Sequence, residues 1–108
     1  MSKEHYSAQI FSPDKTTALY AMLAMTECAE DPAWIAEQLA KLAQHDDADI
    51  SGLAITCFGH LARIRGTVGD FERVCALLEQ KRTQPELAGR VQDALDDFAQ
   101  FLPEWRTR

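Results

Sequence analysis

The sequence predicts an all-α protein, and three observations lead to this prediction. Apolar residues recur at helical spacing in five segments of the 108-residue chain. No segment alternates apolar and polar residues over the length of a strand. Three of the five segments begin with a proline. Proline is favoured at the first helical position because the backbone N–H that it lacks would have no partner within the helix there. Because the length is that of one domain with its own core, we expect a single all-α domain over residues 1–108.

The first two predicted helices cover residues 13–28 and 32–44. Ser12 can cap the first helix, with Pro13 at its first position. Asp31 and Pro32 repeat this start signal before the second helix. Leu19, Met22, Leu23 and Thr26 share one face of the first helix, and Ile35, Leu39 and Leu42 form the apolar stripe of the second. The N-terminal stretch before residue 13, which carries His5, is expected to be mobile.

The third predicted helix covers residues 50–65. Aspartates at 46, 47 and 49 favour a helix N-terminus there electrostatically, and Gly66 is a C-terminal stop. His45, at the end of the preceding helix, would place a cation near that helix's negative pole. The apolar stripe of the third helix is Ile50, Ala54, Cys57, Phe58, Leu61 and Ile64.

The last two predicted helices cover residues 70–82 and 86–102. Asp70 caps the fourth helix and Pro85 opens the fifth. Pro103 ends the fifth, because the residue before a proline avoids the helical region, and the tail after it is expected to be frayed. The inward positions are Phe71, Val74, Leu77 and Leu78, then Leu87, Val91, Ala94, Leu95, Phe98 and Phe101.

An internal repeat of about 37 residues relates the third and fifth predicted helices. The segment DISGLAITCFGHLARI aligns without a gap over ELAGRVQDALDDFAQF, which pairs Gly52 with Gly89 and Phe58 with Leu95. The preceding helices also align, Ile35 with Val74. A small residue at the glycine position lets neighbouring helices approach closely. The chain is therefore expected to contain half a repeat followed by two full helical hairpins.

This period is close to the ~40 residues of HEAT-like and armadillo repeats. The segments GLAITCFGHLARIRG and LAGRVQDALDDF resemble the second helices of short bacterial HEAT-like units. The resemblance covers roughly residues 31–102 and implies a HEAT-like α-solenoid fragment of about five helices. The sequence departs from the commoner pattern because no proline lies between the helices 32–44 and 50–65. An irregular helical bundle is the alternative.

Charge and cysteine content exclude several classes of protein. Eleven Lys and Arg against 17 Asp and Glu give a net charge of −6, which repels nucleic-acid phosphates. No apolar run approaches the ~18 residues of a membrane span, and the N-terminus lacks the apolar region of a secretory signal. The three cysteines, Cys28, Cys57 and Cys75, are predicted to be buried thiols of a reducing, cytoplasmic compartment.

No catalytic, cofactor or metal site is predicted. Cys57 and His60 offer two ligands, whereas structural zinc usually takes four. Acid/base catalysis needs a carboxyl group in an apolar pocket, but the carboxylates here stand at helix starts and on polar faces. The chain also lacks a Gly-x-Ser-x-Gly nucleophile elbow. We therefore expect no enzyme.

A protein-binding surface is expected where second helices of successive hairpins line one face. Arg and Tyr are frequent in interfaces, and carboxylates attract a basic partner. Trp34 stands one step off its helix's inward stripe and would be an outlying anchor. The predicted contact residues are Tyr20, Glu27, Trp34, His60, Arg63, Asp93 and Asp97. The alternative is a solvated face with no partner.

The resemblance extends to function. Short HEAT-like proteins of this kind resemble bacterial immunity proteins, including those of contact-dependent inhibition systems. Such a protein would act as a cytoplasmic monomer and block a cognate toxin domain. The toxin is expected to be a basic nuclease, to which an acidic inhibitor binds quickly. The alternatives are a cytoplasmic HEAT-like scaffold or adaptor, which could self-associate, and a small enzyme or tetrapyrrole-handling protein.

Overall fold

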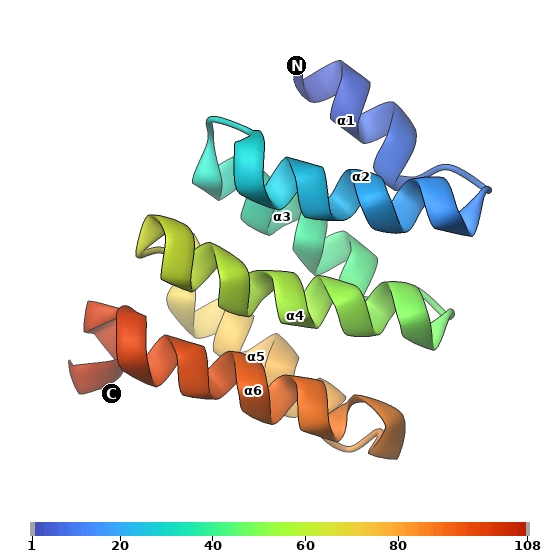
Figure 1. The fold of residues 1–108 in the computed structure, drawn as a ribbon. Coiled ribbons are helices and arrows are strands. Elements are labelled where there is room, and N and C mark those ends of the chain that lie inside the picture. Colours follow the sequence, from blue (N-terminus) through green and yellow to red (C-terminus); the bar gives the residue numbers. More distant parts are fainter. Residues whose placement is uncertain (1, 108) are drawn as a thin grey trace.

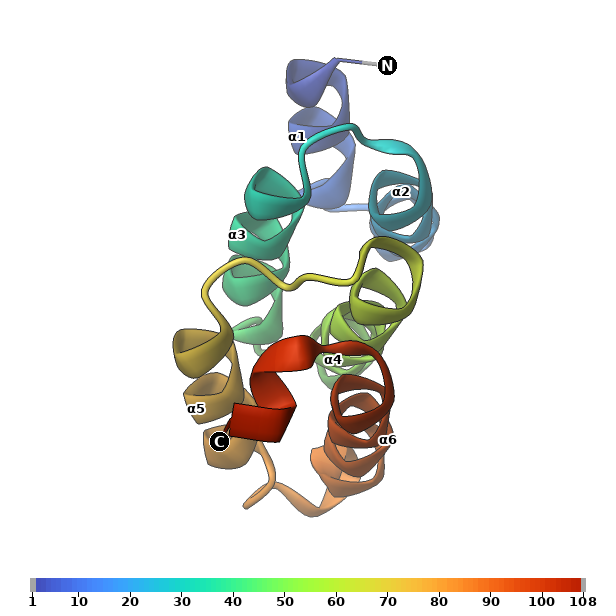
Figure 2. The same cartoon turned by 90° about the vertical axis from the view of Figure 1, so that its left-hand side faces the viewer.

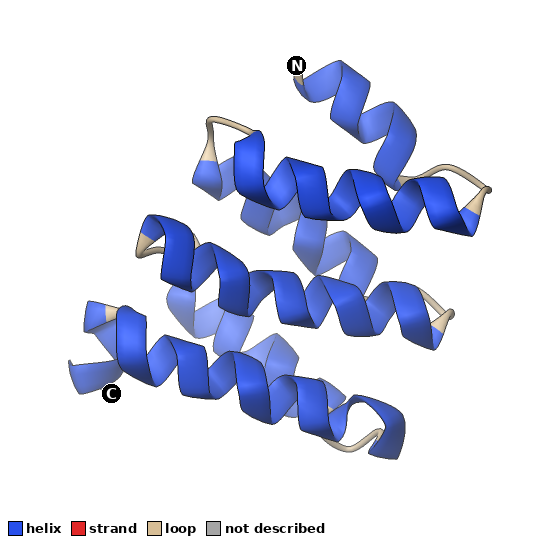
Figure 3. Cartoon of the chain, viewed as in Figure 1, coloured by secondary structure: helices blue, strands red, loops and turns tan. Residues whose placement is uncertain are grey.

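The computed structural model describes residues 2–107, and every regular element in this range is helical (Figures 1 and 3). The predicted all-α class is confirmed. The five expected helices correspond to α2–α6, with ends that differ by at most two residues. The elements are α1 (Lys3–Ile10), α2 (Lys15–Cys28), α3 (Pro32–Ala43), α4 (Ala48–Arg65), α5 (Phe71–Lys81), α6 (Pro85–Phe101) and the 3-10 helix η1 (Pro103–Thr107).

The helices form two layers. Figure 2 shows α1, α3 and α5 in one column and α2, α4 and α6 in the other. Within the second layer α4 packs between α2 and α6, and all three run in the same direction (Figure 1). In the first layer α3 and α5 have few direct backbone contacts, and α3 packs chiefly on α4. The second layer is therefore closely packed, and the first is more open.

Helix α1 corrects the expectation of a mobile N-terminal stretch. Ser2 caps the helix by accepting a hydrogen bond from the His5 backbone N–H. Tyr6 and Ile10, one turn apart, are buried, and α1 packs on α2. These two side chains supply enough apolar contact to hold a helix of only eight residues. The chain thus forms three helical pairs, and the expected half repeat is wrong.

The start of α2 also differs from the prediction. The helix begins at Lys15, and the residue at its N-cap position is Asp14, while the Ser12 hydroxyl accepts from the Asp14 N–H. The Lys15 ammonium lies 3.0 Å from an Asp47 carboxylate oxygen and also pairs with Asp49. Its hydrogen bond lowers the pKa of Asp47. Lys15 thereby links the starts of α2 and α4.

A long-range contact closes the other end of α2. The Arg65 guanidinium of α4 donates to the Ala29 carbonyl at 2.6 Å and to the Glu27 carbonyl at 3.4 Å. These carbonyls have no partner within their own helix. Directly after Arg65, Gly66 ends α4 in the left-handed region at φ 67°, as the sequence predicts.

Phe58 and Phe98 are the largest fully buried side chains, and they belong to the neighbouring helices α4 and α6. Ile64 does not join them, because it is 45% exposed. It follows His60 by four residues and so shares the outer face of α4 with it. Phe101, in the last turn of α6, is only half-buried.

The C-terminal tail also departs from the expectation of fraying. Residues 103–107 form η1, and the ring of Trp105 stands perpendicular to that of Phe71, with centroids 6.4 Å apart. This aromatic contact fixes the tail against the start of α5. Arg108, the last residue of the predicted tail, lies outside the described residues.

Candidate functional site

Six of the seven predicted contact residues lie on the layer formed by α2, α4 and α6. All six are exposed or half-buried, so a partner can reach them. Tyr20 is 71% exposed and is the most exposed of the large apolar side chains in residues 2–107. The six residues are Tyr20 and Glu27 on α2, His60 and Arg63 on α4, and Asp93 and Asp97 on α6. We call this surface the second-helix face.

Arg90 fastens α6 to α4 at the second-helix face. Its guanidinium donates to the Thr56 hydroxyl at 2.9 Å. Its side chain also lies over Gly52, where an added Cβ would come within 2.8 Å of Arg90 Cδ. The small residue at position 52 therefore makes room for this arginine. The aligned Gly89 has nothing within 4 Å of such a Cβ.

Gly59 marks a second close approach between α4 and α6, which the sequence analysis missed. A Cβ at this position would lie 2.5 Å from an Asp97 carboxylate oxygen and 3.3 Å from Ala94 Cα. The absence of a side chain thus lets the half-buried Asp97 lie against α4. Asp93 precedes Asp97 by one turn and is exposed, so the two carboxylates share a face of α6.

The central helix contributes a linked pair of side chains. Arg63 Nη2 lies 2.8 Å from His60 Nδ1. A guanidinium can only donate, so the imidazole nitrogen accepts this hydrogen bond. The contact restricts the direction of the Arg63 fork. Ile64, unexpectedly exposed, adds an apolar side chain beside His60 and was missed because its spacing matched the core stripe.

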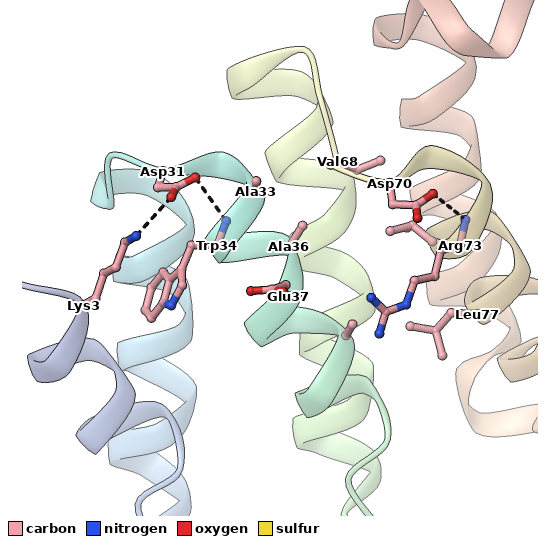
Figure 4. Close-up of a pocket in the computed structure, with 13 residues that line it drawn as sticks. Lys3, Asp31, Ala33, Trp34, Ala36, Glu37, Val68, Asp70, Arg73 and Leu77 are labelled. Carbon is pink, nitrogen blue, oxygen red and sulfur yellow. Dashed lines mark hydrogen bonds and ion pairs between the residues drawn. The ribbon is translucent and has the colours of Figure 1, made fainter.

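Trp34 does not join the second-helix face. It belongs to α3, in the opposite layer, and its half-buried ring lines a groove of about 530 Å³ between α3 and α5. Figure 4 shows Trp34 on one side of α3 and Arg73 of α5 on the other. Ala36 and Ala40 contribute to the floor. Trp34 is half-buried, as expected for a residue one step off the inward stripe of its helix. The sequence does not show in which of the two layers that helix lies.

The carboxyl groups of Asp31 and Asp47 have lowered pKa values, which favours their ionised forms. Hydrogen bonds from Lys3 and from backbone N–H groups lower the pKa of Asp31, and Lys15 lowers that of Asp47. A general acid needs the opposite shift. Residues 2–107 contain no group of three His, Cys, Asp or Glu side chains that could hold a metal ion.

His45 also has a local role. Its Nδ1 accepts a hydrogen bond from the Asp47 N–H at 2.9 Å. The ring therefore stabilises the turn before α4 through a nitrogen that carries no proton. His45 was expected to act as a cation at the end of α3; in the structure it instead accepts a hydrogen bond in the turn that precedes α4.

The cysteines differ in accessibility, and this corrects the prediction that all three are buried. Cys28, in the last turn of α2, is exposed, whereas Cys57 and Cys75 are buried. Burial raises the pKa of the Cys57 thiol to about 11. Because the thiolate is the reactive form, a buried thiol with a raised pKa is inert at neutral pH.

We therefore expect one cysteine of the three to react quickly with an aromatic disulfide reagent at pH 8 in the native protein. Cys28→Ser should abolish this fast reaction, while Cys57→Ser should leave it unchanged. Denaturant should expose all three thiols. Absorbance of the released thiolate measures each stage. Fast labelling of two or three thiols without denaturant would contradict the packing of α4 and α5 described above.

No protein-family model, curated protein or solved structure matches the chain. None of the helices within residues 2–107 is long and apolar enough to cross a membrane.

Proposed function

We propose that the protein is an immunity protein, which binds a cognate antibacterial toxin domain through the second-helix face and neutralises it. The observation that carries the proposal is the gathering of Tyr20, Glu27, His60, Arg63, Asp93 and Asp97 on one layer. Three parallel second helices also support a short HEAT-like array of three hairpins. Its setting would be the cytoplasm of a bacterium that competes by delivering toxins, as in contact-dependent inhibition.

The chemistry of the second-helix face suits a basic partner. Glu27 on α2 and Asp93 and Asp97 on α6 present carboxylates there, and the chain carries a net charge of −6. A nuclease domain must attract nucleic acid and therefore presents cations, which an acidic inhibitor attracts over long range. Tyr20 supplies a rigid apolar surface for the contact. Arg63 would bind a toxin carboxylate in a bidentate manner.

The test begins with capture of partners on the immobilised protein from a lysate of its own source cells. Recovery of one basic domain that kills cells unless this protein is co-expressed would support the proposal. Its association rate with the Asp93→Asn/Asp97→Asn variant should fall about tenfold at low salt and less at high salt. Stopped-flow fluorescence measures both rates.

A matched control separates the position of the charges from their number. Glu72→Gln/Glu79→Gln removes the same two charges from α5, in the opposite layer. This control should change the association rate only slightly. Equal loss in both variants would show that net charge alone matters and that the second-helix face is not the binding site.

The groove between α3 and α5 favours a second candidate function, that of a cytoplasmic adaptor. An adaptor needs two binding surfaces, and the groove lies in the opposite layer from the second-helix face. Capture of two non-toxic proteins that bind at the same time would favour this candidate over the immunity protein.

A further inference from the structure

A lysine of the chain itself, Lys3, lies over the ring of Trp34. The Lys3 ammonium, from α1, lies 5.8 Å from the centroid of the Trp34 ring. It also lies 3.1 Å from an Asp31 carboxylate oxygen, as Figure 4 shows. Asp31 is held in place because its other carboxylate oxygen accepts from the backbone N–H of Trp34 and so caps α3. An aromatic ring and a fixed carboxylate thus share one cation, which is a cation–π arrangement.

Two hollows share the residues of this contact. The groove of about 530 Å³ and a second hollow of about 360 Å³ are both lined by Lys3, Asp31 and Trp34. Lys3 therefore belongs to the walls of both hollows. The Lys3 side chain is 54% exposed and that of Asp31 is 46% exposed. Because both groups are half in water, Lys3 can leave Trp34 without exposing a buried charge.

Further carboxylates line the same two hollows. Glu37 lines the larger hollow and Glu30 the smaller one, and both side chains are exposed. In Figure 4 Glu37 extends toward the Trp34 side of α3, while Arg73 stands across α3 on the α5 side. The carboxylates of Glu30, Asp31 and Glu37 thus line the hollows that Trp34 also lines, and the Lys3 ammonium lies over the Trp34 ring.

We propose that Trp34, Asp31 and Glu37 form a binding site for a lysine side chain of a protein partner, which displaces Lys3. We call it the Trp34 site. Lys3 shows that the site accepts a primary ammonium on a flexible stem, and the two hollows provide room for the partner's flanking backbone. The chemistry excludes an anionic occupant, which Asp31 and Glu37 would repel.

The Trp34 site is independent of the proposed immunity function. It lies on α3 and α1, in the opposite layer from the second-helix face. A partner at the Trp34 site would therefore leave the second-helix face open. The test below also needs no toxin, so failure of one proposal is distinguishable from failure of the other.

The experiment titrates the full-length, ¹⁵N-labelled protein with a peptide and follows the indole N–H signal of Trp34 by NMR. The probe is the acetylated, amidated pentapeptide Gly-Ser-Lys-Ser-Gly, and norleucine in place of lysine gives the neutral control. Trp34→Phe assigns the signal against that of Trp105. We expect saturable shifts with the lysine peptide, none with the norleucine peptide, and loss of binding in Asp31→Asn, which keeps a capping oxygen.

Removal of the competing cation gives the most specific result. Lys3→Ala should bind the lysine peptide about three- to fivefold more tightly, because an exposed cation–π contact no longer has to be broken. Lys3→Met, which retains an apolar stem over the ring, should also bind more tightly. The matched control is Lys15→Ala, because Lys15 also pairs with a helix-capping aspartate but makes no cation–π contact within residues 2–107. This control should bind with unchanged affinity.

Three outcomes would overturn the proposal. Binding of the lysine peptide that is unchanged or weaker in both Lys3 variants would show that Lys3 does not compete for the Trp34 site. Equal binding of the norleucine peptide would show that the contact is apolar. Saturable binding of n-butylammonium without binding of the peptide would restrict the Trp34 site to free amines and exclude a protein partner.

Discussion

Replacement of Phe58 by alanine is expected to destabilise the protein by about 3–5 kcal/mol. Phe58 is fully buried at the middle of α4, the helix that packs against α2, α3 and α6. The truncation removes the ring's apolar burial and leaves a cavity that neighbouring helices fill only in part. For a domain of ordinary stability, this loss is a large fraction of the free energy of unfolding.

Urea unfolding followed by far-ultraviolet circular dichroism measures the change. The matched control is Phe11→Ala, since Phe11 is 49% exposed at the end of α1. It should cost no more than about 0.5 kcal/mol. A similar loss in both variants would contradict the central position of α4. If Phe58→Ala does not fold, Phe58→Leu still gives a measurable loss of about 1 kcal/mol.

Two glycine substitutions should change stability in opposite directions. Gly59→Ala places a Cβ within 2.5 Å of Asp97 and 3.3 Å of the Ala94 backbone, so α4 and α6 must separate or Asp97 must rotate. Such overpacking costs about 1–3 kcal/mol. Gly89→Ala meets no atom within 4 Å, and it should stabilise α6 by about 0.5–1 kcal/mol because alanine loses less backbone entropy in a helix.

The same urea measurement distinguishes the two effects, and Gly59→Ala/Asp97→Ala tests their cause. If the Asp97 carboxylate is the main obstacle, the double variant should recover part of the loss in Gly59→Ala. A stabilising effect of Gly59→Ala, or a clear loss in Gly89→Ala, would show that α4 and α6 are packed in another register.

The helical class and the core of α4 could be predicted from the sequence because long amphipathic segments carry a strong periodic signal. Helix α1 could not, since only Tyr6 and Ile10 of its eight residues are buried. Their spacing is too short a pattern to distinguish from chance. The 3-10 helix at the C-terminus depends on the contact between Trp105 and Phe71. These residues lie at the two ends of one hairpin, so the pattern of neighbouring residues in the sequence does not indicate the contact.

The candidate site could be predicted only where the repeat register governs it. The register places His60, Asp93 and Asp97 on second helices, and the structure places those helices side by side. It does not tell which layer receives Trp34, because a residue at the edge of a stripe can turn to either side. Periodicity likewise assigned Ile64 to the core, although its exposure depends on how far the neighbouring helices extend.

The hydrogen bonds of Arg65 have a consequence for the way the molecule opens. A stack whose units touch only their neighbours can open one unit at a time from either end. Here the guanidinium that completes the end of α2 belongs to α4, and Lys15 ties the other end of α2 to Asp47. The first hairpin therefore cannot detach without stripping contacts from both ends of the second, so slow exchange of amide protons should extend across both hairpins as one cooperative unit.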